Sequence, residues 1–513
     1  MRHPCRPRSR RAFLRDASAA ALGLAVGRGP PARAAPVLSE PDHALLELSA
    51  VQAVQAMATG AITAERYAGA LLARCARLKS LNAFITLEPD RVLEDARDAD
   101  RRRSRGAKIG RLHGLPIPVK DSFSTVQYPT TAGTPALKGF RTTTDAPLVA
   151  TLRAEGAIVL GKTNLHELSF GWTSNNLAFG AVHNPYDFTR IPGGSSGGTA
   201  AAIAAHMAPL GLAEDTEGSI RVPAALCGLT GFRPTTRRYS TVGAVPASAL
   251  FDQAGPHARC IADIELFDRV AARDEVAPRA ADLKGTRLAV SRGYWFADLD
   301  PDVDRLTAEA IAKLRAAGAV IIEAEVPGLP PLLAQTADLV VDHDVRVELA
   351  RFLASHGAKV SFDEIYAQAS ADIRAIFAHE VMPGSPAFVS QAAYDDAVNV
   401  YLPRLRATFK TYFARTGAAA LVFPTTMVTA PRIGDEGQLR VGERLVSFDS
   451  AIGRNIAPGS RAGLPGLVIP AGITAAGLPT GIEFDGPAGT DRALLALGAQ
   501  IEEVLGHVAP PRL

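Results

Sequence analysis

Residues 192–223 read PGGSSGGTAAAIAAHMAPLGLAEDTEGSIRVP, and two serine-bearing turns flank an alanine-rich segment within them. Four glycines surround Ser195 and Ser196, and glycine accepts backbone angles that other residues rarely adopt. The alanine-rich segment predicts a helix, and residues 215–223 then form a second turn around Ser219. Taken alone, each turn is compatible with an ordinary loop as well as with a functional site.

Alternating helices and strands are predicted on both sides of this stretch. Residues 152–159 read LRAEGAIV, and residues 314–321 read LRAAGAVI. In both, the glycine stands where a helix C-cap belongs, and the apolar run after it suits a buried strand. Nearer the N-terminus, Gly60 ends one predicted helix and Thr63 caps the next. This alternation predicts an α/β domain in which helices cover a mostly buried sheet.

The composition of the 513-residue chain is that of a globular protein, with 47% hydrophobic and 21% charged residues. These values exclude a disordered chain, and the length is sufficient for a large core. The formal charge of +3 is unevenly distributed, because residues 1–34 hold eight arginines and one aspartate and the remainder therefore carries −4. A mildly acidic body gives no electrostatic reason to expect a nucleic-acid partner.

The basic residues at the N-terminus form a targeting pattern. Arg10 and Arg11 precede an apolar stretch at 17–27, and the sequence Ala-Arg-Ala follows at 32–34. A membrane span needs about 20 apolar residues, so we predict a twin-arginine signal peptide over 1–34 and no stable membrane anchor. We therefore expect the twin-arginine export machinery as a partner and a periplasmic or secreted location after cleavage. The alternative is a basic disordered tail.

The remaining chain divides into three predicted segments. A linker occupies residues 35–44, one large domain occupies residues 45–505, and a tail occupies residues 506–513. Within the domain, the charged residues at 94–106 predict a solvated helix or loop.

Three short motifs have ordinary structural explanations. Residues 156–163, GAIVLGKT, fit the phosphate-loop pattern, but their middle residues are strand formers whose N–H groups belong in a sheet. Residues 193–197, GGSSG, match the G-x-S-x-G pattern of a Ser-His-Asp hydrolase but lack the strand that should precede the serine. Residues 342–344, Asp-His-Asp, have no partner cluster at metal-ligand spacing, so we predict no metal site.

A lysine adds a candidate base to the two serine turns. Lys120 follows the apolar residues LPIPV at 115–119. A lysine at the end of such a run is either exposed or buried, and burial lowers its pKa and makes it a usable base.

The order and spacing of these pieces resemble the amidase signature family of serine hydrolases. The residues that carry the resemblance are Lys120, the GGSSGG run at 193–198 and the DTEGSIR run at 215–221, with 24 residues from Ser195 to Ser219. Other matching segments are TAGT at 131–134, GKTN at 161–164, HNPYD at 183–187 and GLPTGI at 477–482. The resemblance covers the whole predicted domain and implies an α/β amidase-signature fold, a large mixed central sheet covered by helices on both faces.

The resemblance implies a catalytic triad. Ser219 is the nucleophile, Lys120 is the ultimate base in its neutral form, and Ser195 bridges the two from a non-proline cis peptide bond. The chemistry agrees, because an amide carbonyl is a poor electrophile whose attack needs an activated hydroxyl and a stabilised oxyanion. No metal or cofactor is implied.

The resemblance also implies the groups that support the triad. Asp215 and Arg221 pair and brace the second turn, and Ser196 supports the hydrogen-bond network. The backbone N–H groups that form the oxyanion hole are those of Thr216, Glu217, Gly218 and Ser219.

Two residues depart from the family pattern. Glu217 stands where the family usually has glycine, and Glu214 stands where it often has threonine. A carboxylate at Glu217 either repels anionic substrates or points away from the cleft. If Glu217 had positive φ, its backbone would be strained. These acids also motivate a non-enzymatic alternative, a degenerate amide-binding protein.

Within the family, the amino-acid sequence is most similar to those of indoleacetamide and mandelamide hydrolases. The segments that carry this likeness are AGTPAL at 132–137, TSNN at 173–176, NPYDFTRIPGG at 184–194 and DGPAGTDRALLALG at 485–498. It implies an exported amidase that converts a small neutral aryl or arylacetamide-type amide to acid and ammonia through an acyl-enzyme. An esterase or a peptide-amide hydrolase on the same triad is an alternative, the export signal argues against a glutamyl-tRNA amidotransferase subunit, and a homodimer is left open.

Overall fold

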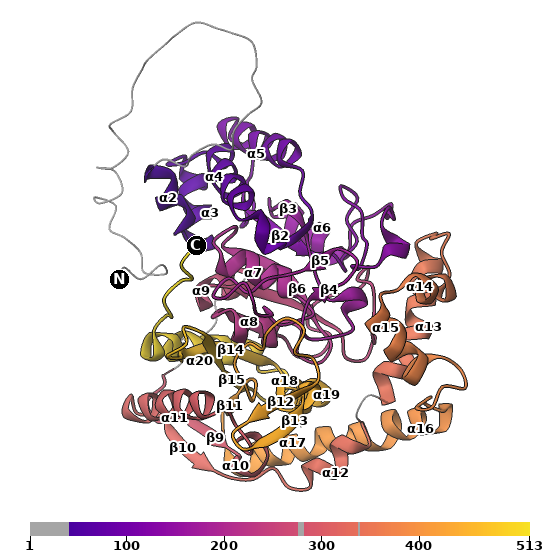
Figure 1. Ribbon diagram of the computed structural model, residues 1–513. Helices are drawn as coiled ribbons and strands as arrows, with labels where there is room; N and C mark the ends of the chain where they lie inside the picture. Colours follow the sequence, from indigo (N-terminus) through magenta and orange to yellow (C-terminus); the bar gives the residue numbers. More distant parts are fainter. Residues whose placement is uncertain (1–39, 275–281, 337–338) are drawn as a thin grey trace, which may run out of the picture.

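The computed structural model describes residues 40–274, 282–336 and 339–513. The predicted signal peptide at 1–34 lies outside these described residues. Within them, eleven strands form one sheet in the order β1-β3-β2-β6-β8-β7-β14-β15-β11-β9-β10 (Figure 1). The strands are β1 Phe84–Thr86, β2 Pro116–Lys120, β3 Ile158–Thr163, β6 Leu210–Asp215, β7 Thr230–Arg233, β8 Gln253–Ala258, β9 Arg287–Val290, β10 Val320–Glu323, β11 Ala420–Pro424, β14 Gly466–Ile473 and β15 Pro479–Asp485.

The sheet is mixed. Strand β2 is parallel to both β3 and β6, and β9 is parallel to β10 and β11. Antiparallel pairing joins β6 to β8, β8 to β7, β7 to β14, β14 to β15 and β15 to β11. Two short ribbons lie outside the sheet, β4 Asn175–Asn176 with β5 Gly180–Ala181, and β12 Gln438–Val441 with β13 Arg444–Ser447.

Helices cover both faces of the sheet, as expected. Leu467 and Val468 are neighbours in β14 and therefore point to opposite faces. Leu467 lies next to Gly498 of α20, whereas Val468 and Ala225 of α8 lie on the same side of Gly481. The first helices are α2 Glu40–Leu46, α3 Ala50–Thr59, α4 Ala64–Arg77, α5 Pro89–Ser104, α6 Pro147–Ala154, α7 Gly197–Ala204, α8 Arg221–Leu226, α9 Ile261–Ala271, α10 Arg292–Trp295 and α11 Pro301–Ala316. The remaining helices are α12 Leu329–Ala334, α13 Leu339–Ser355, α14 Phe362–Gln368, α15 Ala371–Ile376, α16 Gln391–Asp396, α17 Leu402–Thr416, α18 Phe448–Gly453, α19 Ala457–Ala462 and α20 Asp491–Leu505.

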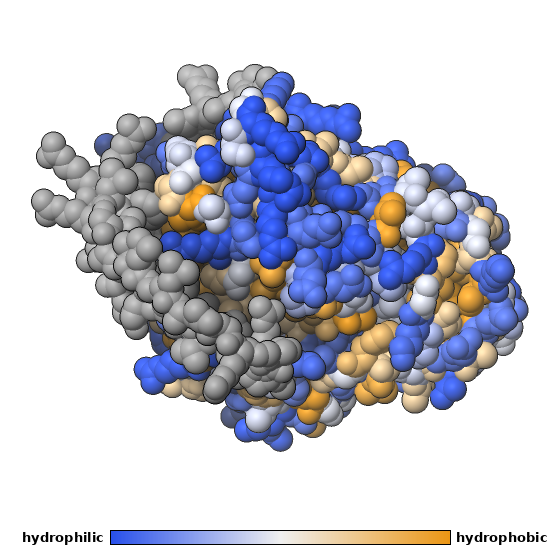
Figure 2. Space-filling model, turned by 90° about the horizontal axis from the view of Figure 1, so that it is seen from above, coloured by the Kyte–Doolittle hydropathy of each residue, from blue (hydrophilic) through white to orange (hydrophobic). Residues whose placement is uncertain are grey.

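The predicted helix boundaries are confirmed where a local signal marks them. Helix α3 ends at Gly60, whose φ is 75°, and the side chain of Thr63 accepts a hydrogen bond at the start of α4. Gly156 and Gly318 have positive φ and separate α6 from β3 and α11 from β10. The charged segment is helical, and Figure 2, which looks down on the end of the molecule that carries α5, shows a mainly hydrophilic surface there.

Two expectations need correction. The predicted linker at 35–44 is wrong at its C-terminal end, because helix α2 begins at Glu40. Pro41 does not prevent this helix, since proline is tolerated in a first helical turn. Leu45 and Leu46 of α2 are buried in the core. The strand after Gly318 is not buried as predicted, because β10 is the last strand of the sheet and Val320 is exposed. None of the helices in the described ranges combines the length and the apolar composition that a bilayer crossing requires.

Candidate active site

Two parallel strands place a lysine and two acidic residues at the same edge of the sheet. Lys120 is the last residue of β2, and Glu214 and Asp215 are the last two residues of β6. The two strands are neighbours, with Val119 opposite Leu212. Because the carboxyl ends of parallel strands meet at one edge, the three polar side chains gather where an open α/β sheet usually places its ligands.

Lys120 is fully buried at this edge. Its Nζ lies 2.7 Å from Ser195 Oγ, within hydrogen-bond distance, and 2.9 Å from Glu214 Oε2. Burial lowers the pKa of Lys120 below its usual range, although the charge and hydrogen bond of Glu214 act in the opposite direction. The predicted lysine is therefore buried and in contact with one of the two predicted serines.

The first serine turn lies directly before α7. The Gly194–Ser195 peptide bond is cis, in agreement with the family resemblance. Gly194 cannot carry a side chain, because a Cβ there would lie 2.7 Å from the carbonyl carbon of Trp172. The carbonyl of Ser195 accepts hydrogen bonds from the N–H of His166 and from Ser174 Oγ, both at 3.1 Å. These contacts fix the backbone that presents Ser195 to Lys120.

The second serine turn connects β6 to α8 and is held by a buried carboxylate. Asp215 accepts the N–H of Gly218 at 2.6 Å and the N–H of Ile220 at 3.0 Å. Arg221 pairs with Asp215 at 3.1 Å, as predicted. Burial opposes the charged form of Asp215, but Arg221 and Arg233 outweigh it and bring its pKa to about 2. Ser219 is thus carried on a loop braced by a buried ion pair.

The predicted oxyanion hole requires one correction. The N–H of Gly218 is already bound by Asp215, so it is not available to a substrate oxygen. In the described part of the chain, the N–H groups of Thr216 and Ser219 have no hydrogen-bond acceptor. The contribution of Gly218 is conformational: the turn has a φ of 129° at this position, which is unfavourable for a residue with a side chain.

Main-chain and side-chain contacts join the two serine turns. The N–H of Ser196 donates to the carbonyl of Ser219 at 3.3 Å, and Ser196 Oγ donates to the carbonyl of Glu214 at 2.9 Å. The hydrogen bond expected between Ser195 and Ser219 is not formed, since Ser219 Oγ has no partner among the described residues. Such bonds are often long in a free enzyme and tighten when substrate binds.

Glu214 and Glu217 each have a buried partner that the sequence did not reveal. Glu214 contacts Lys120, and Glu217 forms a two-point ion pair with Arg461 at 2.6 and 3.0 Å. Glu217 does not have positive φ; the left-handed position in the turn belongs to Gly218. The condition for backbone strain at Glu217 is therefore not met, and its carboxylate is directed to Arg461.

A histidine base finds no support in this geometry. Within the described residues, no histidine side chain contacts Ser195 or Ser219. The Nδ1 atom of His166 lies 3.0 Å from Thr173 Oγ1, and burial lowers the pKa of His166 to about 4. His257 Nε2 lies 2.7 Å from the carbonyl of Ile220, and burial likewise lowers its pKa to about 4. Both imidazoles are therefore neutral near pH 7.

The structure also explains the phosphate-loop pattern at 156–163 and the Asp-His-Asp sequence at 342–344. Residues 158–163 form β3, and Lys162 is buried with its Nζ 2.7 Å from Asp121, so the phosphate-loop lookalike is an ordinary strand. His343 lies on α13 and stacks on Tyr394 with 3.8 Å between ring centroids. The described residues contain no cluster of three or more side chains that could hold a metal ion.

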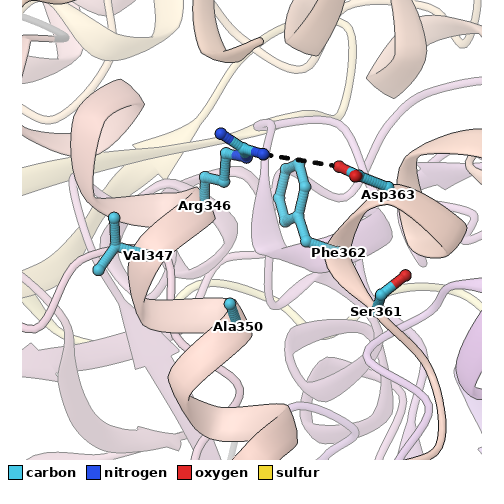
Figure 3. A pocket seen from close by; sticks show the side chains of 6 residues that line it. All are labelled: Arg346, Val347, Ala350, Ser361, Phe362 and Asp363. Carbon is cyan, nitrogen blue, oxygen red and sulfur yellow. Dashed lines mark ion pairs between the residues drawn. The ribbon is translucent and has the colours of Figure 1, made fainter. Parts of the chain in front are cut away.

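A surface hollow of about 280 Å³ lies on α13 and α14, away from both serine turns. Its lining residues are Arg346, Val347, Ala350, Ser361, Phe362 and Asp363 (Figure 3). Arg346 lies 3.8 Å from Asp363 in a half-exposed ion pair beside the ring of Phe362. The hollow contains none of the predicted site residues.

Comparisons with known proteins decide the family. The Amidase family model matches residues 67–495. The chain belongs to the amidase family. This amidase is 38% identical to an indoleacetamide hydrolase from Rhizobium radiobacter, over 85% of this chain and 92% of that protein. It is 35% identical to a mandelamide hydrolase from Pseudomonas putida, over 93% and 94% of the two chains.

Solved structures agree with the sequence comparison. The peptide amidase from Stenotrophomonas maltophilia aligns with a TM-score of 0.75 at 28% identity, covering 90% of this chain and 98% of that one. The amidase described here is therefore an α/β enzyme that hydrolyses amide carbon–nitrogen bonds.

Proposed function

We propose that this amidase hydrolyses a small, neutral aryl or arylacetamide-type amide to the acid and ammonia, with Ser219, Ser195 and Lys120 as its triad. The observation that carries the proposal is the 2.7 Å contact between the buried Lys120 Nζ and Ser195 Oγ. The next residue, Ser196, is hydrogen-bonded to the carbonyl of Ser219. A neutral, buried amine in contact with a serine is the arrangement that removes a proton from a hydroxyl.

The reaction proceeds in two halves. Ser219 Oγ attacks the amide carbonyl while its proton passes to Ser195 and the proton of Ser195 passes to Lys120. The same route returns a proton to the leaving nitrogen as the carbon–nitrogen bond breaks, which releases ammonia and leaves an ester on Ser219. Water then attacks this ester, and the backbone N–H groups of Thr216 and Ser219 stabilise the oxyanion in both halves.

The apolar surroundings of Ser219 support an aryl substrate. Val222 and Ile456 belong to a buried apolar cluster, and the partly buried Trp172 packs against it. Gly218 lies against this cluster, because a Cβ at this position would overlap Ile456 Cδ1. Val222 and Ile456 are fully buried, so Trp172 is the residue among these three that an aromatic acyl group can contact, and such a contact excludes water from both rings. The indoleacetamide and mandelamide hydrolases among the relatives are named for aromatic amides and support the same class.

The test is a hydrolysis screen read as ammonia release. The panel contains phenylacetamide, mandelamide, indole-3-acetamide, an aliphatic amide, a carboxylate-bearing amide, a C-terminally amidated peptide and an aryl ester. We expect the aryl acetamides to have the highest kcat/KM. Preference for the amidated peptide or the ester would support the corresponding alternative hydrolase, and no turnover at all would support a degenerate amide-binding protein.

Three variants test the triad. We expect Lys120→Ala and Ser219→Ala each to abolish turnover and Ser195→Ala to reduce it severely, with strongly non-additive losses because the three side chains act as one relay. Near-wild-type activity of folded Lys120→Ala at neutral pH would overturn the assignment.

We also propose that the protein leaves the cytoplasm through the twin-arginine route. The proposal is supported by Arg10, Arg11, the short apolar stretch at 17–27 and the Ala-Arg-Ala sequence at 32–34. Replacing Arg10 and Arg11 by lysine should retain the protein in the cytoplasm, as measured by cell fractionation. A periplasmic double variant would rule the route out.

A further inference from the structure

We propose that Glu214 is a positioning residue for catalysis, which holds Lys120 against Ser195 and raises its affinity for the transferred proton. The inference rests on the proposed function of Lys120 as the base. Glu214 is the next-to-last residue of β6 and is buried. Its carboxylate lies 2.9 Å from Lys120 Nζ, the same atom that lies 2.7 Å from Ser195 Oγ.

Hydrogen bonds fix the Glu214 carboxylate in place. Oε2 accepts from Lys120 Nζ and also from Ser169 Oγ at 3.0 Å. Oε1 lies 3.2 Å from Thr216 Oγ1. Because both oxygens have donors, the carboxylate has little freedom to rotate, and Lys120 is held at a defined position.

The hydroxyl of Thr216 connects Glu214 to a second buried carboxyl group, that of Asp252. Thr216 Oγ1 is 3.2 Å from Glu214 and 2.7 Å from Asp252 Oδ1, yet a hydroxyl carries only one proton. Asp252 Oδ2 already accepts the N–H groups of Ala247 and Ser248. Burial, followed by the charge of Glu214, raises the pKa of Asp252 to about 8. A protonated Asp252 can donate to Thr216, which leaves the Thr216 hydroxyl proton for Glu214.

The other charged and titratable groups around Lys120 are committed elsewhere. Asp215, beside Glu214 on β6, pairs with Arg221 and Arg233. The groups that face the site from the remaining elements are the ion pair between Asp121, directly after β2, and Lys162 of β3, and two neutral histidines. The histidines are His166, directly before the short helix Glu167–Ser169, and His257 of β8. Within the described residues, Glu214 is thus the carboxylate in direct contact with Lys120 Nζ.

The consequence appears when Lys120 accepts a proton. As Ser219 forms its bond to the substrate carbonyl carbon, its proton moves to Ser195 and the proton of Ser195 moves to Lys120. The resulting ammonium group lies against the Glu214 carboxylate, which stabilises it in the buried interior. Without this anion, burial alone would make the amine a weaker proton acceptor. The proton then returns through Ser195 to the leaving nitrogen.

The experiment is the pH dependence of kcat/KM in wild type, Glu214→Gln and the control Glu502→Gln, with phenylacetamide as substrate. The acid limb of the profile is the range in which kcat/KM falls as Lys120 becomes protonated. In Glu214→Gln we expect this limb to move down by about 1–3 pH units, because an adjacent opposite charge shifts the pKa of a lysine by about that amount. We also expect the plateau to fall about tenfold or more, because a weaker base accelerates proton transfer less. Glu502 is a buried carboxyl on α20 that accepts the N–H of Ile261, so its replacement removes a matched group outside the site and should leave the limb in place.

An acid limb at the wild-type pH in folded Glu214→Gln would overturn the proposal. If that variant does not fold, Glu214→Asp retains a carboxylate but draws it away from Lys120 Nζ, and we expect a smaller shift in the same direction; an unmoved limb would again overturn the proposal. Lys120→Ala separates the two levels of inference. A dead Lys120→Ala enzyme with an unmoved Glu214→Gln limb refutes only the role of Glu214, whereas an active Lys120→Ala enzyme refutes the triad itself.

Discussion

The ion pair between Glu217 and Arg461 gives the most quantitative test of how the Ser219 loop is held. The two side chains are about nine-tenths buried, and their two contacts measure 2.6 and 3.0 Å. Replacing Glu217 by glutamine keeps the shape of the side chain but removes the negative charge that contacts Arg461. Removing one partner of a buried pair costs about 3–5 kcal/mol, so we expect the free energy of unfolding to fall by that amount.

Urea denaturation at pH 7 measures the change, with Glu217→Gln, Arg461→Met and the double variant completing a cycle. We expect the double variant to recover most of the loss, because replacing both charges removes the desolvation penalty together with the attraction. A second readout is kcat/KM for a neutral and a carboxylate-bearing amide, and loss of the Glu217 charge should raise the ratio in favour of the anion. A loss below about 1 kcal/mol in Glu217→Gln together with an unchanged substrate ratio would refute the inferred role of the pair.

Three further predictions concern the same region. Gly218→Ala should reduce kcat/KM at least about 100-fold and destabilise the protein by about 1–3 kcal/mol in urea, because the new Cβ takes a φ of 129° and overlaps Ile456; full activity would contradict the loop geometry. Relative to wild type, Asp252→Asn should become more stable as the pH rises from about 4 to 8, by up to about 1.4 kcal/mol per pH unit. The reason is that folded wild type keeps a proton on Asp252 that unfolded wild type has lost, so wild type alone loses stability over this range; parallel stability curves would contradict this. Turnover should rise towards alkaline pH as Lys120 loses its proton and should be unchanged by EDTA, and a maximum below about pH 5 or a zinc-restored loss would contradict a lysine base.

Local signals in the sequence predicted the elements that depend on local chemistry. Gly60, Thr63, Gly156 and Gly318 mark helix ends, and the structure places a helix boundary at each of them. These signals work because a left-handed glycine or a side-chain cap satisfies backbone groups of its own turn. The order of strands in the sheet has no such local cause, since pairing of β8 with β6 and β7 depends on packing across the whole domain.

The candidate site was predictable to the extent that motif spacing specifies it. Lys120 and Ser195 are 75 positions apart, yet their contact follows from the resemblance. The contact between Lys120 and Glu214 spans 94 positions, and that between Glu217 and Arg461 spans 244. No property of either glutamate in the sequence identifies its partner, because the fold alone brings these distant side chains together. The sequence marked both residues as unusual without revealing what they contact.

The same limit explains the error in the oxyanion hole. A motif gives the order of Thr216, Gly218 and Ser219 but not the direction of each N–H. The structure turns the N–H of Gly218 towards Asp215, whose position depends on buried Arg221. Backbone direction in a tight turn is therefore set partly by tertiary partners.

The central claim, that Ser219 is a nucleophile activated by Lys120, is tested most directly by covalent labelling. Wild-type protein, Lys120→Ala and Ser219→Ala are treated with a fluorogenic acyl-phosphonate probe at neutral pH, and the labelled peptide is located by mass spectrometry. We predict a single label on Ser219 in the wild type, none in Ser219→Ala and little in folded Lys120→Ala. Labelling of another residue, or equal labelling of wild type and Lys120→Ala, would contradict the claim.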